Sequence, residues 1–258
     1  MKILLSLVLA VLGCGPASRA SASAEVDEPA PLTFDAPDGK KVFAELFPAP
    51  QKSKAPLLIL FHQAGSNLGE YRPLIPSWTS AGFNCLAVSL RSGGAMWNEP
   101  NQTAAQFRKD PGYLAAYLDM QAAVVWALKQ GYPRIGVVGS SYSASLAFHL
   151  AEDQPEISMV AAFSPGEYGE MEGSVAAWVR KVRCPIFVAC SETEHDDTMI
   201  LYKNAHPPEA LAKQNRFIMF APGAHGASAM RMDRNKESAD KYQAEFLKFL
   251  RAWQRNWK

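Results

Sequence analysis

Ser141 stands where a strand-like segment turns directly into a helix-like one, within the run IGVVGSSYSASL at residues 135–146. The apolar, β-branched residues before the turn are typical of a buried strand, and the residues after it follow a helical pattern. Such a corner tolerates only small side chains two positions before and after it, and here those positions are Gly139 and Ser143. The corner would lift a serine hydroxyl clear of the sheet and point the N–H of Tyr142 at a developing negative oxygen. The pattern therefore predicts a nucleophilic serine on a strand-to-helix elbow.

Two neighbouring serines are alternatives to Ser141. Ser140 would require Val138 and Tyr142 to be small, and Ser143 falls within the first turn of the helix. A Gly–x–Ser–x–Ser motif is weak on its own, because joints rich in glycine and serine are common between strands and helices. The residues that follow the other strands therefore decide the question.

Polar or glycine-rich loops also follow three other strand-like runs. The pairs of strand and loop are Leu57–Phe61 with His62–Asn67, Pro185–Ala189 with Ser191–Asp197, and Arg216–Phe220 with Pro222–Gly226. In parallel sheets, ligands bind outside the carboxyl ends of the strands. Ser141, an acid of the second loop and His225 of the third would then meet at one edge of the sheet. Their chain order of serine, acid and histidine is the order found in α/β-hydrolases.

These side chains require a mainly parallel, twisted sheet with helices on both faces. The predicted strands are Leu32–Phe34, Val42–Phe47, Leu57–Phe61, Phe83–Leu90, Arg134–Gly139, Ile157–Phe163, Pro185–Ala189 and Arg216–Phe220. The first two flank Pro37-Asp38-Gly39 and predict an N-terminal antiparallel hairpin at one edge. The later strands alternate with helical patterns, which implies right-handed crossovers and the α/β-hydrolase fold.

The predicted helices lie between these strands. They cover residues 71–78, 110–130, the segment after Ser141 up to about residue 152, 175–180, 210–214 and a closing segment that ends near 253. Asp110-Pro111 is expected to begin the longest one. One face of that helix would carry Leu114, Leu118, Ala122 and Val125. The closing helix has an apolar stripe made of Tyr242, Phe246, Phe249, Leu250 and Trp253.

Four motifs resemble those of small α/β-hydrolases of the dienelactone-hydrolase-like group, which are related to the catalytic domains of prolyl oligopeptidases. They are the oxyanion loop Phe61–Gly65, the elbow Gly139–Ser143, the acid turn Ser191–Asp197 and the histidine loop Gly223–Gly226. The resemblance covers about residues 32–257. Two features depart from it: Ser143 replaces the second glycine of the elbow, and the acid turn lacks the usual G-x-x-D. Dienelactone hydrolases proper use a cysteine nucleophile, so their substrate is not carried over to this serine.

The residues and the resemblance imply the same catalytic groups. Ser141 would attack a carbonyl carbon, with His225 acting as general base and then as general acid. The backbone N–H groups of Gln63 and Tyr142 would form the oxyanion hole. Glu194 would orient the histidine and complete a catalytic triad.

The acid and the pocket are the least narrowly determined parts of the site. Related hydrolases place the acid shortly after the last buried position of its strand, which reaches Glu194 if the strand ends near residue 190. Asp196 and Asp197 lie on the same turn and remain alternatives. Trp97 and Tyr168 are candidate substrate-binding residues, with a place in the core as the alternative, because aromatic side chains near strand ends belong to the core as often as to a pocket.

The favoured function is hydrolysis of a small-molecule carboxylic ester, with peptides or thioesters as alternative substrates. A binding lipoprotein on a non-catalytic hydrolase fold is the alternative from another class. The formal net charge of +1 and the absence of a basic run argue against a nucleic-acid partner. No C-x-x-C or H-E-x-x-H spacing supports a metal, no cofactor is expected, and no oligomeric state is predicted. Cys85, Cys184 and Cys190 lie in or beside apolar runs and are expected to be buried.

The first 31 residues predict export rather than a folded element. The apolar run Ile3–Leu12 has the length of the central region of a signal peptide, and Val11-Leu12-Gly13-Cys14 resembles a bacterial lipobox. Residues 15–31 would be a flexible tether, and the hydrolase domain would cover 32–258. The expected location is the periplasm or cell envelope, with the membrane reached only through a lipid on Cys14. An A-x-A pattern at residues 22–24 predicts a soluble exported form instead.

Labelled palmitate tests this anchor in a bacterial host. The wild-type chain is expected to incorporate the label and to sediment with membranes, whereas Cys14→Ala should lose both properties. A mature wild-type chain that begins at Glu25 and stays in the soluble periplasmic fraction would contradict the anchor.

Overall fold

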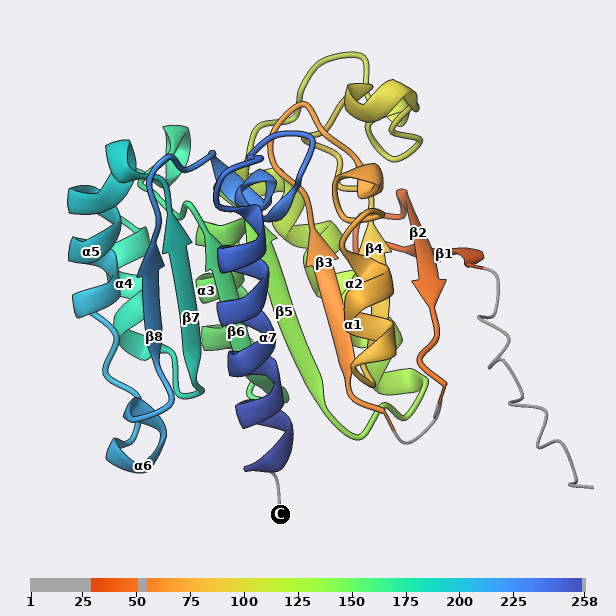
Figure 1. Cartoon of the computed structure of the whole chain (residues 1–258). Coiled ribbons are helices and arrows are strands. Elements are labelled where there is room, and N and C mark those ends of the chain that lie inside the picture. The colour runs from red at the N-terminus through yellow and green to blue at the C-terminus, as the bar shows by residue number, and fades with distance from the viewer. Residues whose placement is uncertain (1–28, 51–54, 257–258) are drawn as a thin grey trace, which may run out of the picture.

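A run of five fully buried apolar residues forms β3 (Leu57–Phe61), which lies in the middle of an eight-stranded sheet. The computed structural model describes residues 29–50 and 55–256 (Figure 1). The strands follow the order β1-β2-β4-β3-β5-β6-β7-β8. The others are β1 (Ala30–Asp35), β2 (Lys41–Phe47), β4 (Asn84–Val88), β5 (Ile135–Ser140), β6 (Ile157–Phe163), β7 (Ile186–Cys190) and β8 (Arg216–Met219).

The direction of the strands confirms the predicted fold class. β1 pairs with β2 and β2 with β4 in antiparallel fashion, whereas every pair from β4 to β8 is parallel. Phe61 lies opposite both Val88 and Gly139, so the carboxyl ends of these strands are level with one another. The loops expected to carry the chemistry therefore leave the sheet at one edge.

Helices cover both faces of the sheet (Figure 1). The helices are α1 (Ile75–Ser80), α2 (Tyr117–Lys129), α3 (Tyr142–Asp153), α4 (Val175–Lys181), α5 (His195–Lys203), α6 (Glu209–Ala212) and α7 (Ala239–Arg255). The helices α1 and α7 lie on the near face in Figure 1, and α2, α3 and α4 lie on the far face. Within the described residues, no helix is both long and apolar enough to span a bilayer.

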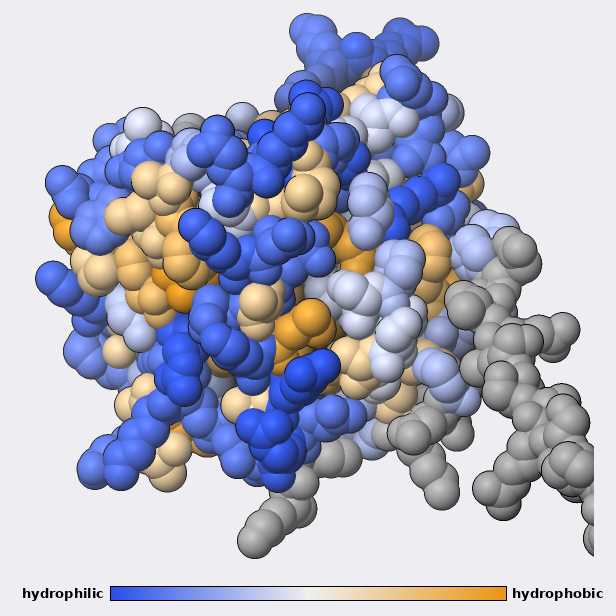
Figure 2. Space-filling view, viewed as in Figure 1, coloured by the Kyte–Doolittle hydropathy of each residue, from blue (hydrophilic) through white to orange (hydrophobic). Residues whose placement is uncertain are grey.

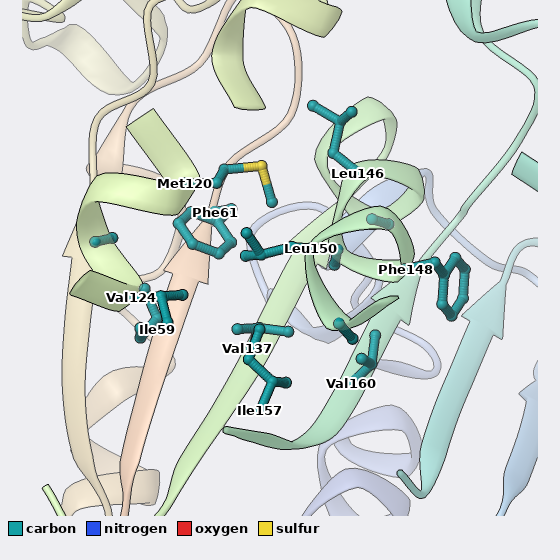
Figure 3. Close-up of a cluster of buried hydrophobic side chains, with 14 of the residues drawn as sticks. Ile59, Phe61, Met120, Val124, Val137, Leu146, Phe148, Leu150, Ile157 and Val160 are labelled. Carbon is teal, nitrogen blue, oxygen red and sulfur yellow. The ribbon is translucent and has the colours of Figure 1, made fainter. Parts of the chain in front are cut away.

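Two apolar clusters hold these layers together, one on each face of the sheet. Figure 3 shows part of the first cluster, where Met120 and Val124 of α2 and Leu150 of α3 pack against Phe61 and Val137 of the sheet. The second cluster includes the predicted stripe of α7, whose five members are all buried. Charged and polar residues cover much of the outer face of α7, and apolar residues show over the edge strand β8 (Figure 2).

The start of the longest predicted helix is corrected by the structure. The chain does not become α-helical at Asp110; a single 3-10 turn precedes α2, which begins at Tyr117. Gly112 has a φ of +84°, which ends any helix that began at Asp110, and the Asp110 carboxylate accepts a hydrogen bond from the Gly112 N–H at 3.0 Å. The Asp-Pro-Gly sequence therefore makes a turn here, not a helix cap.

The inward face of α2 also differs from the expectation. Leu114 and Val125, assigned to the buried face, are 40% and 43% exposed. The buried face instead carries Asp119, which receives hydrogen bonds from the Nε, Nη2 and backbone N–H of Arg91. An inward carboxylate interrupts the apolar periodicity, so a pattern based on hydrophobicity selects the wrong side of the helix.

The predicted signal segment, Cys14 and residues 15–28 of the predicted tether lie outside the described residues. Cys85, Cys184 and Cys190 are buried, as predicted.

Removal of the Asp119 carboxylate should destabilise the fold. Asp119→Ala leaves Arg91, whose side chain is 3% exposed, with only Asp38 as an acidic partner. Breaking a buried pair costs about 3–5 kcal/mol, and we expect the lower end of that range because Asp38 remains. Asp35→Ala removes the exposed pair with Lys41 and should cost at most about 1 kcal/mol. Urea unfolding measures both values, and equal losses would contradict the assigned importance of Asp119.

Candidate active site

Ser141 occupies the single residue between β5 and α3, as the elbow pattern predicts. Its backbone has a φ of 60° and a ψ of −125°, a conformation that residues with side chains rarely adopt. Its N–H donates to the Phe163 carbonyl of β6 at 2.8 Å, and its carbonyl accepts from the Ala144 N–H at 2.9 Å. The strained residue is thus held on both sides by backbone hydrogen bonds.

The small residues around the corner have separate roles. A Cβ on Gly139 would lie 2.5 Å from the Cα of Ala144, so α3 could not approach β5 with a larger residue there. Ser143, which replaces the usual second glycine, donates from its hydroxyl to the Phe61 carbonyl at 2.8 Å and accepts from the Ser140 N–H at 2.9 Å. This serine therefore ties the elbow to β3 rather than weakening it.

Glu194 is the acid that the structure brings to His225. The Nδ1 of His225 is hydrogen-bonded to Oε1 of Glu194. Asp196 and Asp197 lie in the exposed first turn of α5, where Asp196 pairs with His195 at 2.8 Å. Of the three acids left open by the sequence, the geometry selects Glu194.

Backbone geometry explains why Glu194 reaches the histidine. Ser191 and Glu194 form a capping box, in which the Ser191 N–H donates to Oε2 of Glu194 at 2.9 Å. This reciprocal pair holds the carboxylate close to the end of β7. Burial by itself would raise the pKa of Glu194, but hydrogen bonds from His225, Ser164 and Ser191 outweigh it and lower the pKa to about 2. Glu194 is therefore a carboxylate at any pH near neutrality.

Ser164 completes this arrangement and escaped the sequence analysis. It directly follows β6 with a φ of 52°. Its hydroxyl donates to Oε2 of Glu194 at 2.7 Å and accepts from the N–H of Gly226 at 2.9 Å. One side chain thus links the acid to the histidine loop. Its place at the carboxyl end of β6 is the signal that could have identified it, because ligands bind outside the carboxyl ends of parallel strands.

The prediction that the backbone N–H of Gln63 belongs to the oxyanion hole is corrected by a hydrogen bond that this N–H already makes. The backbone N–H of Gln63 donates to Oε2 of the buried Glu70 at 2.8 Å, so it is not available to a substrate. The next N–H along the loop belongs to Ala64, and no hydrogen-bond partner is found for it among the described residues. Tyr142 keeps its predicted place, because its N–H is the first in α3 and follows Ser141 directly.

The two candidate pocket residues separate into different hollows. Tyr168 lines a cavity of about 540 Å³ together with His225, Pro165, Ile200 and Leu201. The Tyr168 ring meets His225 edge to face at 6.4 Å, and its hydroxyl donates to the Ser164 carbonyl at 2.7 Å.

Trp97 instead lines a second hollow of about 560 Å³, next to Arg72 and Arg231. The Arg231 guanidinium lies 3.7 Å from its ring centroid, and the indole N–H donates to the Ser66 hydroxyl at 2.8 Å. Neither Ser141 nor His225 lines that hollow, so Trp97 and Tyr168 lie in different hollows, and a role of Trp97 in substrate binding stays a prediction.

Another cluster, outside the site, has the donor atoms of a metal centre. Oxygen or nitrogen atoms of His149, Glu152 and Asp153 on α3 lie within 4.8 Å of one another. Protein groups already engage them: Lys181 pairs with Glu152, the Tyr117 hydroxyl donates to Asp153, and the Tyr117 ring stacks on His149 at 4.3 Å. Among the described residues, Nδ1 of His149 and Oε2 of Glu152 have no hydrogen-bond partner.

Comparison with known proteins agrees with this geometry. Residues 43–254 match the model of the dienelactone hydrolase family. No protein of curated function matches the chain in sequence. The fold is similar to that of the esterase Pf2001 of Pyrococcus furiosus, with a TM-score of 0.67 and 19% identity over 88% of this chain and 93% of the other.

Two further structures share the fold. Est1E from Butyrivibrio proteoclasticus has a TM-score of 0.65 and 14% identity, and the match covers 88% of this chain and 99% of that one. The acylaminoacyl peptidase of Pyrococcus horikoshii also has a TM-score of 0.65, with 15% identity over 90% of this chain but 42% of the larger enzyme.

The choice among the three acids is tested by replacing each with its amide. Glu194→Gln should lower turnover of an ester by about four orders of magnitude, because an amide no longer stabilises the imidazolium or selects the right tautomer. Asp196→Asn, which changes an exposed acid outside the cavity beside His225, should retain near wild-type turnover, and Asp197→Asn, which changes an exposed acid at the cavity wall, should keep turnover far above that of Glu194→Gln. The reverse result, with Asp197→Asn inactive and Glu194→Gln active, would show that the acid is misassigned.

Proposed function

Because the chain belongs to the dienelactone hydrolase family, we propose that it is a serine hydrolase that cleaves a small carboxylic ester through Ser141, His225 and Glu194. The family and the esterase neighbours make the chain a hydrolase of the α/β-hydrolase fold. The observation that carries the finer assignment is the strained backbone of Ser141 at the end of β5, next to the histidine loop. A Cβ on Gly226 would lie 3.8 Å from the Ser141 nitrogen, and the neighbouring His225 is paired with Glu194.

The proposed reaction proceeds through an acyl-enzyme. The Ser141 hydroxyl attacks the ester carbonyl while Nε2 of His225 accepts its proton, and Glu194 stabilises the imidazolium through Nδ1. The N–H groups of Tyr142 and Ala64 stabilise the tetrahedral oxyanion. His225 then gives the proton to the leaving alcohol, and a water molecule releases the acid by the same steps in the second half of the reaction.

Serine rather than cysteine chemistry is supported by the buried thiols. Cys85, Cys184 and Cys190 are buried, and burial raises the pKa of the last two to about 12. A thiol with such a pKa is almost wholly protonated near neutral pH and is a poor nucleophile. None of these three cysteines stands at the elbow.

The cavity beside His225 supports a small or medium-sized organic ester as the substrate. Its volume of about 540 Å³ falls within the range of small-molecule sites. Apolar side chains such as Ile200 and Leu201 line it together with the acids Glu167, Glu194 and Asp197, so the cavity disfavours an anionic group and suits an uncharged alkyl or aryl group. A peptide or thioester would use the same nucleophile, so a panel of p-nitrophenyl esters, acyl thioesters and acylated peptides distinguishes these substrates.

The nucleophile is tested with a fluorophosphonate probe and p-nitrophenyl acetate. The wild-type protein should react with the probe and hydrolyse the ester, and Ser141→Ala should lose labelling and about four orders of magnitude or more of turnover. Ser80→Ala, which alters an exposed serine at the end of α1, should leave both unchanged. A folded wild-type protein that neither reacts nor hydrolyses any ester would favour the non-catalytic alternative.

A further inference from the structure

A buried carboxylate lies behind the oxyanion loop and takes no part in the reaction as described. Glu70 ends a 3-10 turn, Leu68–Glu70, and is 0% exposed. It accepts hydrogen bonds from the Gln63 N–H at 2.8 Å, the Gln63 side-chain amide at 3.2 Å, the Ser66 hydroxyl at 3.3 Å and the Ser140 hydroxyl at 2.7 Å. Four donors converge on one acid, an arrangement suited to a carboxylate because only the ionised form offers acceptor sites alone.

The environment of Glu70 contains opposing electrostatic effects. Burial raises the pKa of Glu70, and the hydrogen bonds from the Gln63 N–H, Ser140 and Ser66, together with the charge of Arg231, offset this rise only in part. The Arg231 guanidinium donates to the Glu70 carbonyl at 2.8 Å and to the Gly69 carbonyl at 3.1 Å. The cation is thus held close to the turn without forming a direct salt bridge with the carboxylate.

The peptides on the two sides of Gln63 are each held by hydrogen bonds. Glu70 holds the Gln63 N–H, which belongs to the His62–Gln63 peptide. The carbonyl of the Gln63–Ala64 peptide is hydrogen-bonded to Nδ1 of His62 at 2.8 Å and accepts from the Ser66 N–H at 3.3 Å. Nε2 of His62 accepts from the Leu90 N–H at 2.8 Å, so the proton of the neutral ring must reside on Nδ1. Burial lowers the pKa of His62 to about 4, which keeps the ring neutral near pH 7.

The direction of the Ala64 N–H follows from this arrangement. In a trans peptide, the N–H points opposite to the carbonyl of the preceding residue. Because the Gln63 carbonyl is turned towards the buried His62, the Ala64 N–H is turned away from it.

Ser140 extends the same network to the histidine loop. Its hydroxyl donates to Glu70 and accepts from the Ala227 N–H at 2.9 Å. A Cβ on Gly226 would collide with the Ser140 hydroxyl, so the loop packs directly on this side chain. Glu70 therefore connects the oxyanion loop, the residue before Ser141 and the loop that carries His225.

We propose that Glu70 is a positioning residue of the oxyanion hole, which orients the N–H of Ala64 through the backbone of Gln63. This inference rests on the proposed hydrolase function. Loss of the carboxylate should affect the tetrahedral transition state more than the bound ester, because the oxyanion forms its full contacts only during reaction.

Glu70→Gln tests this role with three measurements on folded protein. The amide keeps the size of the side chain but offers one acceptor oxygen, and its NH2 group faces donors that it cannot satisfy. We expect kcat for p-nitrophenyl acetate to fall at least about tenfold, since loss of a whole oxyanion donor costs about 10²–10³. KM should change less than about threefold, and the inhibition constant of phenylboronic acid should rise by the factor that kcat/KM falls.

Two other variants complete the experiment. Glu45 is a largely buried acid of β2 that pairs with Arg72 and lies outside the network. Glu45→Gln should therefore leave all three constants unchanged. Ser140→Ala removes one donor to Glu70 and should reproduce part of the loss in kcat. If Glu70→Gln does not fold cooperatively in urea, Ser140→Ala decides by the same measurements.

The outcomes separate this inference from the proposed function. A folded Glu70→Gln variant with wild-type kcat and boronate affinity overturns the positioning role and leaves the hydrolase assignment intact. A loss that appears wholly in KM also overturns it, because it would place Glu70 in substrate binding. An inert wild-type protein that does not react with the fluorophosphonate removes the proposed function and this inference together.

Discussion

The site depends on one backbone constraint, the positive φ of Ser141 between β5 and α3. A residue in such a conformation costs of order 1–3 kcal/mol and persists only where its surroundings determine it. Here the Ser141 N–H bonds to β6, Ser143 bonds to β3, and Gly139 allows α3 to lie against β5. The parallel core of the sheet thus holds the strained corner, and the corner places the hydroxyl where the acid and histidine loops converge.

Serine hydroxyls organise the polar edge around this corner. Ser140 and Ser164 each donate to a carboxylate and accept a backbone N–H from the histidine loop, at Ala227 and Gly226 respectively. A hydroxyl can donate and accept at once, so each serine joins an acid to a backbone segment in a way that an alanine cannot. Glu70 and Glu194 are the two carboxylates, one behind the oxyanion loop and one behind the histidine. The catalytic atoms are therefore supported from two sides by similar chemistry.

The sequence predicts a feature well when residues close to it in the chain determine that feature. The strands Leu57–Phe61 and Ile157–Phe163 were predicted with their true bounds because continuous apolar runs need no distant information. The elbow followed from a size rule over five residues, and the acid from the distance to the end of its strand.

Expectations failed where a distant partner decides the outcome. The N–H of Gln63, predicted as an oxyanion donor, donates to the carboxylate of Glu70 instead. Asp119 lies on the buried face of α2 because its carboxylate pairs with the buried Arg91. Trp97 stacks on Arg231, which no local pattern around the tryptophan reveals. The positions of Ser141, Glu194 and His225 in the fold were thus more predictable than the groups that hold them.

The bonds between the site loops have a consequence for how the molecule folds. The Ser140 hydroxyl is bonded to one residue that lies 70 positions before it in the chain and to another that lies 87 positions after it. The Ser164 hydroxyl is bonded to a residue 62 positions after it. Closing such long loops costs chain entropy, which only the assembled core of the sheet can offset. No contiguous fragment of the chain contains both the oxyanion loop and the histidine loop without nearly the whole sheet between them. The loops of the proposed site are consequently brought together only by the completed topology of the sheet.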